Sequence, residues 1–530
     1  MMKAVRLLMA GAMAGYIWNE LAPGRAAGIV LSVCSLGAAA LLPGIVKGIP
    51  RLLGLLFTTA GVVMYARHGT AWQEAINGFG RMLNVITLLT IVPIVSLPIE
   101  LGGYARRIQT VIRSNIRHTG PLYIVTSLLS FVLSAFMSLA TLPMVYRVIR
   151  PSVDLYPVEH KERFMSRAIT HGYSMPFLWT PVAPIVGVVV EMTGVSWGRM
   201  LPLVIPFSLL GLVLDCGMGL AIAGRHRRRM AAPVLAVPAS GFRSADIQRA
   251  SGLKNDVWLR GIGAGDGPAV SDGELRTAHS RPKQPWSSDA EDPDAAASIV
   301  AAAEAPENPS SPDLSSPQRG RNPFQILLAM AVFGLSLPLL QAVTGLGFLL
   351  LVTLFTIPFA LMWAVFISEG RTFVVNIREL LPMQLLRMKD QFLVLICAGF
   401  MISAIESTGA GLTVNAGISL LGGLVGEHLF LALIPMIPLA LSMAGVHPVV
   451  GTALTAGALN PALLHVPVEL TAMAMLVGAS CSYMLGPYNA TAGLMSSLSG
   501  ETPQRISNWN APFTAVFLLT AMVFLYVSSM

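Results

Sequence analysis

The 530-residue chain is too apolar for a soluble protein, because 54% of its residues are hydrophobic and only 12% are charged, whereas soluble domains carry about a quarter charged residues. Its net charge of +8 does not indicate a nucleic-acid partner, since basic residues gather in short loops between apolar segments, where they set membrane orientation. We therefore predict an all-α polytopic membrane protein with no cofactor. The cysteines lie in apolar segments without metal-binding spacing, so we expect free thiols and no metal centre: Cys34, Cys216, Cys397 and Cys481.

Apolar runs near the ~20 residues needed to cross a bilayer divide the first half of the chain. The predicted spans are 4–21, 26–43, 52–66, 82–102, 168–190 and 201–223. The first run follows two basic residues and resembles a signal peptide, but we interpret it as a retained extra span.

A proline-bearing apolar segment, 121–146, lies between the fourth and fifth of these spans and has basic residues on both sides. Basic loops lie in the cytoplasm. The segment should therefore enter and leave from the cytoplasmic side, as a re-entrant hairpin and not as a span. Non-helical backbone at that depth requires cover by protein or a water-filled cavity.

Residues 225–322 differ in composition from the rest of the chain, being rich in Pro, Ser, Ala, Asp and Glu and lacking periodicity. We predict a disordered cytoplasmic linker that tethers two halves. The spans after it are 323–342, 346–368, 391–408, 468–490 and 511–528. A second proline-bearing segment, 428–460, has no Lys or Arg in the adjoining loops, which predicts a hairpin entering from the outside.

One pattern of residues occurs twice, 306 positions apart. The residues Gly172, Ser174, Pro181, Gly187, Gly194, Arg199, Pro206 and Phe207 recur as Gly478, Ser480, Pro487, Gly493, Gly500, Arg505, Pro512 and Phe513. We interpret Gly187, Gly194, Gly493 and Gly500 as sites of close helix packing. Two related halves, each with a helix broken by Pro and Gly, indicate a secondary transporter.

The predicted architecture is 11 transmembrane helices plus two re-entrant hairpins in two inverted-topology repeats. An extra span occupies 1–24, the first repeat 25–224, the linker 225–322 and the second repeat 323–530. The charge distribution places the N-terminus and the linker in the cytoplasm and the C-terminus outside, in the cytoplasmic (inner) membrane.

Helices that are interrupted at mid-membrane expose free amides at one end and free carbonyls at the other. Amide ends favour anions and carbonyl ends favour cations. The prolines interrupt the helical ladder, and the Asn489 amide offers both a donor and an acceptor. The candidate substrate-binding residues lie at the two hairpin tips and the two breaks: Ser138, Ala140, Thr141, Pro143, Thr180, Pro181, Ser442, Gly445, His447, Pro448, Gly486, Pro487, Asn489 and Thr491.

The candidates for binding a coupling ion, H⁺ or Na⁺, are His447, Glu100, Glu406 and Asp215. Each has a structural alternative. His447 could cap the turn beside Pro448, and the two glutamates, which the 306-residue offset also pairs, could be hydrated at span ends. Asp215 lies inside an apolar span, where an unpaired carboxylate is costly, so it needs a buried partner or an interfacial position. His171, at the start of a broken span, is a weaker candidate.

Residues 479–490, Ala-Ser-Cys-Ser-Tyr-Met-Leu-Gly-Pro-Tyr-Asn-Ala, resemble the unwound span of the ion transporter superfamily. That group includes divalent-anion/sodium symporters, citrate transporters, and arsenite and sodium/proton antiporters. The resemblance implies inverted repeats, elevator-like alternating access and a homodimer. The sodium/dicarboxylate branch carries Ser-Asn-Thr at both tips, whereas the matching positions here are 138–140 and 444–446, without Asn. The resemblance therefore places this chain in a different branch.

We therefore predict an ion-coupled secondary active transporter in the lipid bilayer, with alternating access and a small anion of the carboxylate class as substrate. The alternative is a cation/proton antiporter of the same superfamily. That activity needs a buried carboxylate at the site, and neither the tips nor the breaks contain Asp or Glu. A membrane-embedded enzyme would need clustered catalytic side chains, whereas the nine histidines are scattered, so we expect no enzyme.

Overall fold

The computed structural model describes residues 2–68, 72–104, 107–109, 112, 116, 118–154, 158–235, 321–409, 425–459 and 466–530. Throughout these residues the secondary structure is helical, without a β-strand, which confirms the all-α prediction. Two compact units divide the chain, Met1–Leu220 with Ala290–Met530, and Ala221–Asp289. The first unit holds the hairpins and the broken helices and is described below.

The described residues contain ten segments long and apolar enough to cross a membrane, so the chain is a multi-pass integral membrane protein. Nine of these segments coincide with predicted spans, and the tenth, Thr119–Val153, contains the first predicted hairpin. The predicted span 4–21 forms a helix outside this set, and the predicted span 168–190 is divided into two shorter helices.

The helices of the first half are α1 (Met2–Leu21), α2 (Arg25–Leu41), α3 (Gly48–His68), α4 (Trp72–Gly78), α5 (Leu83–Ile91), α6 (Ser96–Leu101), α8 (Thr119–Met137), α9 (Thr141–Val153), α10 (Lys161–Ser174), α11 (Pro184–Thr193) and α12 (Trp197–Leu235). Those of the second half are α15 (Phe324–Thr344), α16 (Phe348–Phe366), α17 (Gly370–Arg387), α18 (Lys389–Ser407), α20 (Glu427–Leu433), α21 (Met436–Met443), α22 (Pro448–Ala458), α23 (Val468–Leu485), α24 (Ala490–Ser499) and α25 (Pro503–Ser529). Short 3-10 turns are η2 (Val92–Val95), η3 (Ser138–Ala140) and η4 (Met175–Leu178).

Helix bounds recur at the offset of 306 found in the sequence. Helix α11 spans 184–193 and α24 spans 490–499, while α5 and α6 together span 83–101 and α18 spans 389–407. Two helix features depart from the sequence analysis. Helix α17 occupies a stretch that was expected to be a basic loop, and α12 continues to Leu235, past the predicted start of the linker at residue 225. The remainder of the predicted linker lies outside the described residues, apart from its last positions.

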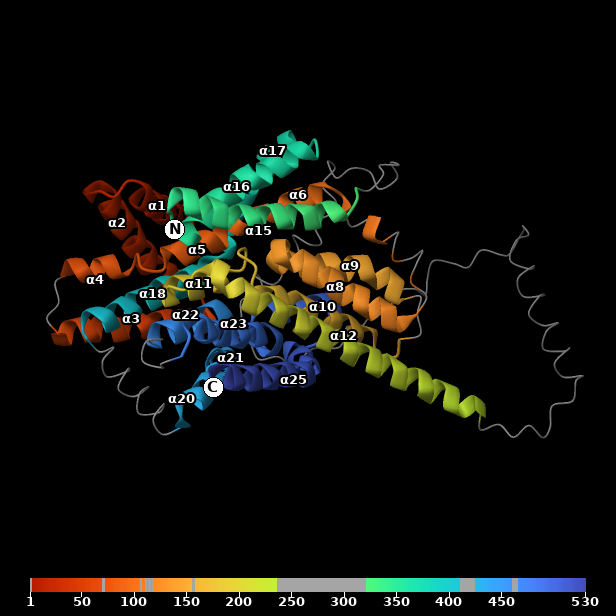
Figure 1. Ribbon diagram of the computed structural model, residues 1–530. Helices are drawn as coiled ribbons and strands as arrows, with labels where there is room; N and C mark the ends of the chain where they lie inside the picture. Colours follow the sequence, from red (N-terminus) through yellow and green to blue (C-terminus); the bar gives the residue numbers. More distant parts are fainter. Residues whose placement is uncertain are drawn as a thin grey trace, which may run out of the picture. The chain divides into compact units, whose positions relative to one another are not determined.

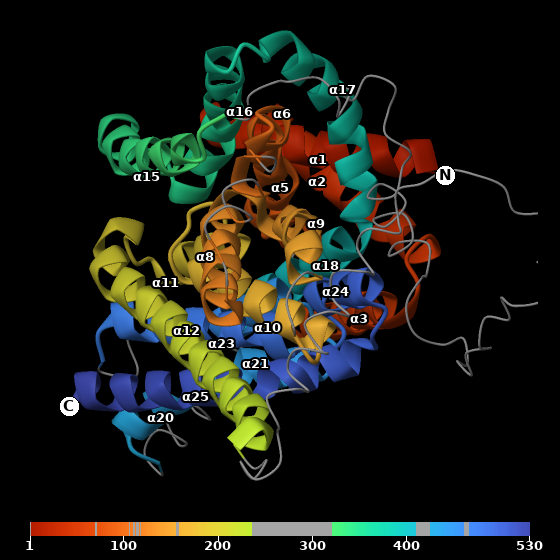
Figure 2. The same cartoon turned by 90° about the vertical axis from the view of Figure 1, so that its right-hand side faces the viewer.

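In both views of the first unit, α15, α16 and α17 gather with α1, α5 and α6 on one side, and α20, α21 and α25 lie on the other (Figure 1, Figure 2). Helices α8 to α11 lie between these groups. Helix α16 packs on α5 and α6, and α3 packs along α18. The first hairpin and the first broken helix therefore lie between the two outer groups, whereas α20 and α21 of the second hairpin belong to one of these groups.

Both proline-bearing segments fold as helical hairpins. Helices α8 and α9 pack against each other and are joined by the turn η3, and α21 packs against α22 after the turn at 444–447. The half-helices then exchange partners between the halves, since α11 packs on α22 and α24 packs on α9. Each broken helix thus supports the hairpin of the other half.

The glycines that recur at the 306-residue offset have different structural roles. A Cβ on Gly172 would lie 2.2 Å from the Ser127 carbonyl oxygen, and a Cβ on Gly478 would lie 2.4 Å from the Pro435 carbonyl oxygen. These two glycines therefore let each broken helix touch the backbone of its own hairpin. Four glycines were expected at packing sites. A Cβ on Gly187 would clash with the Leu349 side chain, whereas a Cβ on Gly493 would have no atom within 4 Å.

Gly194 and Gly500, the other two glycines expected at packing sites, have a different structural reason. Their φ angles are +70° and +72°, and they end helices α11 and α24 in the left-handed conformation. A glycine is favoured there because it lacks the Cβ that penalises positive φ. The packing interpretation was therefore wrong for these two positions.

Candidate functional site

The tip of the first hairpin meets the second broken helix around one tyrosine. Tyr173, in α10, is buried, and its hydroxyl lies close to the hydroxyls of Ser138 and Thr491. Ser138 opens the tip with a φ of 45°, a backbone conformation that is unusual for a residue other than glycine. The turn therefore aims a serine side chain toward the start of α24.

A second tyrosine joins the tip of the other hairpin to the same region. The Tyr483 ring, in α23, lies 6.4 Å from the His447 ring and 4.8 Å from the Phe177 ring, measured between centroids. The Tyr173 and Tyr483 rings are 6.4 Å apart. The structure thus brings Ser138, His447 and Thr491, all named from the sequence, around an aromatic group. Neither Tyr173 nor Phe177 was named, because a lone aromatic residue in an apolar helix carries no distinguishing signal.

Two helix starts lie beside this aromatic group. Helix α9 begins at Thr141 and α24 begins at Ala490, and the two helices pack together. The side chains of Thr141 and Thr491 are 0% and 1% exposed. The Thr141 hydroxyl has no hydrogen-bond partner among the described residues, and the Thr491 hydroxyl lies beside that of Tyr173. Buried polar groups are normally paired. The amides of two helix starts and these buried hydroxyls together form the kind of donor set that binds an anion.

Asn489 holds the second break together. Its side-chain oxygen accepts a hydrogen bond from the Ala492 amide at 2.7 Å, and its nitrogen donates to the carbonyl oxygens of Ser482 and Tyr483 at 2.8 and 3.1 Å. Asn489 therefore caps both the end of α23 and the start of α24. The sequence predicted a donor and an acceptor at this position, and in this structure both serve the backbone of the break.

The last carbonyls of α23 are also satisfied by side chains from α25. Ser507 donates to the Leu485 carbonyl, and Asn510 donates to the Met484 carbonyl. Together with Asn489, these groups pair the four final carbonyls of the helix. Each carbonyl at the end of α23 therefore accepts a side-chain hydrogen bond in the conformation seen here.

The first break is fixed to the first hairpin and to α12. Thr180 Oγ1 donates to the Ala135 carbonyl at 2.8 Å, and the Trp197 indole donates to the Trp179 carbonyl at 2.9 Å. Thr180 and Pro181 are both buried. These contacts position the break, and Pro184 begins α11 directly after it.

The second hairpin tip touches the second break. Ser442 Oγ lies 3.5 Å from the Ser482 carbonyl, and a Cβ on Gly486 would lie 2.3 Å from Ser442 Oγ. Gly445 has a φ of 94° in this tip. The His447 ring accepts a hydrogen bond from the Val449 amide at 3.3 Å, so the histidine caps α22, as its structural alternative expected.

The remaining tip and break positions are placed as follows. Ala140 ends the turn η3 at the first tip, and Pro143 lies in the first turn of α9. Pro448 is the first residue of α22, and Pro487 is buried between α23 and α24.

The candidates for coupling-ion binding separate into two kinds. Glu406 pairs with Arg81 at 2.7 Å, with both side chains about half exposed, and the exposed Glu100 carboxylate accepts a 3.3 Å hydrogen bond from Ser96. Asp215, in contrast, is 1% exposed and bonded to side chains of α8 and α10. Asp215 thus has the buried partners that the sequence required, although the sequence could not identify them.

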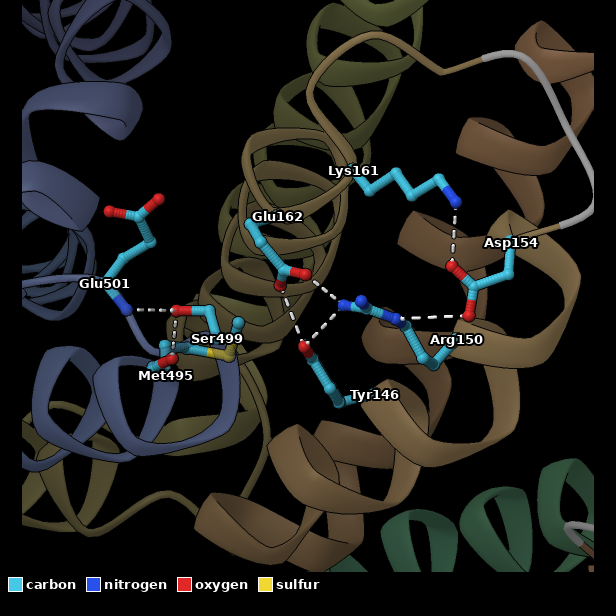
Figure 3. Close-up of polar contacts among 8 residues, drawn as sticks. All are labelled: Tyr146, Arg150, Asp154, Lys161, Glu162, Met495, Ser499 and Glu501. Carbon is cyan, nitrogen blue, oxygen red and sulfur yellow. Dashed lines mark hydrogen bonds and ion pairs between the residues drawn. The ribbon is translucent and has the colours of Figure 1, made fainter. Parts of the chain in front are cut away.

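Ionic contacts close the far end of the first hairpin, as Figure 3 shows. Arg150 of α9 bonds both Glu162 and the Tyr146 hydroxyl, and Lys161 bonds Asp154 at 2.9 Å. The Lys161 ammonium and then the Arg150 guanidinium hold the pKa of Asp154 below its usual value. The contacts attach the end of α9 to the start of α10.

A cavity of about 520 Å³ lies elsewhere in the first unit. Its lining includes Glu20, Arg81, Glu191 and Glu406, but none of the residues of the hairpin tips. The Arg81–Glu406 ion pair spans part of its wall. The cavity is therefore separate from the candidate site.

No protein-family model matches the chain, and no curated protein matches it. Among solved structures, the crystal structure of the YdaH transporter of Alcanivorax borkumensis, which has an unusual topology, is similar over 90% of this chain and 97% of that chain. The sequence identity is 14% and the TM-score is 0.50. At this identity the similarity establishes the fold alone, so the chain shares its fold with a membrane transporter.

Proposed function

We propose that the protein is a secondary active transporter for a small carboxylate anion, coupled to H⁺ or Na⁺. The observation that carries this proposal is the meeting of the α9 and α24 helix starts, each with a buried threonine hydroxyl in its first turn. Thr141 and Thr491 add hydrogen-bond donors to amides that already favour negative charge. The fold shared with a transporter supports the same reading.

The other tip and break residues have supporting roles in this proposal. Ser138 and Ala140 at the first tip, and Ser442, Gly445 and Pro448 at the second, shape the walls of the site. The two helix breaks are formed and capped by the residues within them: Thr180, Pro181, Gly486, Pro487 and Asn489. His447 orients α22 through its cap on Val449.

The proposed mechanism is alternating access through two inverted repeats, with the hairpins and broken helices moving like an elevator against the remaining helices. Ser480 Oγ donates to the Ser174 carbonyl at 2.8 Å, and these two residues are equivalent at the 306-residue offset. A pseudo-two-fold axis between the halves would bring equivalent residues together in this way. The exchange of α11 onto α22 and α24 onto α9 has the same symmetry.

The charge distribution supports a membrane location and an orientation, and the family resemblance supports an oligomeric state. We place the protein in the inner membrane, with the N-terminus and the linker in the cytoplasm and the C-terminus outside. The assembly proposed by resemblance is a homodimer.

Binding of labelled mono-, di- and tricarboxylates to the purified full-length protein tests the site. Thr141→Val and Thr491→Val remove one hydroxyl each with little change in volume, and we expect each to weaken binding about 10-fold or more, because a hydrogen bond to a charged group contributes ~1.5–3 kcal/mol. Thr520→Val is the control, since Thr520 bonds only its own helix at an exposed position. Equal binding by all three variants would exclude this site.

A further inference from the structure

The Asp215 carboxylate is the centre of a buried polar cluster that the proposed anion site does not use. It accepts hydrogen bonds from the Tyr123 hydroxyl and the Ser127 hydroxyl, both at 2.7 Å, and lies 2.6 Å from His171 Nδ1. His171 is 0% exposed and Asp215 is 1% exposed. An ionisable pair inside the membrane is costly, and such groups usually have a function.

The hydrogen-bond pattern leaves one nitrogen of the His171 ring without a partner among the described residues. Because both hydroxyls donate to the carboxylate, the ionised form of Asp215 is satisfied by Tyr123, Ser127 and the Nδ1–H of His171. His171 Nε2 is then a buried ring nitrogen, and it has no partner among the described residues. The pair can therefore take up a proton at Nε2, or at the carboxylate, and change its net charge by one.

The groups facing the pair come from each helix packed around it. Arg167 of α10 and Cys216 of α12 lie close to the Tyr123–Asp215 contact. The Phe513 ring of α25 stacks on the imidazole at 4.2 Å. Arg167 is the fixed positive charge of the group, so the ionised Asp215 is partly balanced whether or not His171 carries a proton.

The second half of the chain lacks this cluster. The cluster consists of Tyr123, Ser127, Arg167, His171 and Asp215. At the offset of 306, the corresponding residues are all apolar: Leu429, Leu433, Met473, Val477 and Ala521. All five of these positions are helical in the second half, in α20, α23 and α25. A requirement of the fold common to both halves would be expected to recur in both, so the cluster serves a purpose particular to the first half.

The cluster also joins parts that belong to the candidate site. Tyr123 and Ser127 lie on α8, which leads to the first hairpin tip, and His171 lies two residues before Tyr173 on α10. Protonation of the carboxylate would weaken its acceptance of hydrogen bonds from α8. The proton balance of the pair can therefore bias the position of the first hairpin.

We propose that the His171–Asp215 pair binds the proton that drives the transporter, which makes H⁺ the coupling ion. This inference rests on the proposed transport function for its role, but the proton site itself is independent of the substrate. Proton binding at the pair would favour one position of the hairpin, and proton release would favour the other.

Infrared difference spectra of the full-length protein in lipid vesicles, between pH 8 and pH 5, test the site with protons as the only ligand. We expect carboxyl and imidazole difference signals between the two pH values, and Asp215→Asn and His171→Gln should remove them. Tyr123→Phe keeps the pair but removes a hydrogen-bond donor to the carboxylate, so the carboxyl signal should shift in frequency. A spectrum unchanged by any of these substitutions would overturn the proposal, and the Tyr123→Phe result decides it if the other variants do not fold.

Transport in the same vesicles separates this inference from the proposed function. With Asp215→Asn, exchange of labelled carboxylate across the membrane should continue, while accumulation driven by a pH gradient should fall to its level without a gradient. Gradient-driven accumulation by Asp215→Asn equal to that of the wild type would contradict the coupling role. If the wild type moves no carboxylate, the proposed function fails, and the infrared titration alone then decides whether the proton site exists.

Discussion

Replacing Gly478 with alanine tests the close approach between the second broken helix and its hairpin. The added Cβ would lie 2.4 Å from the Pro435 carbonyl oxygen, and side-chain carbons in real structures essentially never come within 3.0 Å of such an atom. The two backbones must therefore separate by about 0.6 Å. Both atoms belong to or adjoin main chain, so no flexible side chain can give way, and overpacking of this kind costs about 1–3 kcal/mol.

Gly493→Ala is the matched control, because Gly493 is also helical and nothing lies within 4 Å of a Cβ there. Both substitutions gain similar helix propensity, about 1 kcal/mol, so the difference in stability between the two variants isolates the clash. Thermal unfolding of the purified protein, followed by tryptophan fluorescence, should place Gly478→Ala below both the wild type and Gly493→Ala. Equal melting temperatures for the two variants would show that Gly478 is not required for a close approach of the two backbones.

Two further predictions concern the second break and the far end of the first hairpin. Asn489→Ala removes three hydrogen bonds at a buried position and should lower stability by about 2–4 kcal/mol, since helix caps and unpaired buried groups each contribute ~1–2; an unchanged thermal melting temperature would contradict the capping role. Lys161 and then Arg150 lower the pKa of Asp154 in the folded protein. The ionised Asp154 therefore stabilises the fold above the pKa of the unfolded chain, ~3.9, and this stabilisation is lost as the pH falls through the lower pKa of the folded protein. Melting curves of the wild type and Asp154→Asn should therefore converge on acidification below about pH 4, and a difference that persists at lower pH would count against this ion pair.

Local backbone chemistry allowed much of the fold to be predicted from the sequence. The hairpin tips were expected near Ser138 and near 442–448, and the structure has turns at 138–140 and 444–447. Serine, glycine and proline are the residues that interrupt helices, so these positions are visible without tertiary information. The span predicted at 391–408 is a helix at 389–407. It could be recognised because its apolar run is long and uninterrupted.

Long-range contacts and amphipathic helices could not be predicted in the same way. Asp215 bonds residues that lie 44, 88 and 92 positions away, and no spacing rule connects them. Helix α17 was missed because arginines interrupt its apolar residues, so it lacks the continuous apolar run by which spans were recognised. Asn489 was named correctly as a donor and an acceptor, but only the fold shows that both groups bond the broken backbone.

Uptake of labelled carboxylates into proteoliposomes, under separate proton and sodium gradients, is the direct test of the proposed anion transport. We expect gradient-dependent uptake of at least one carboxylate by the wild type, retained in Thr520→Val and strongly reduced in Thr141→Val and Thr491→Val. Absence of carboxylate uptake together with sodium-driven proton movement would contradict the anion site and favour a cation/proton antiporter.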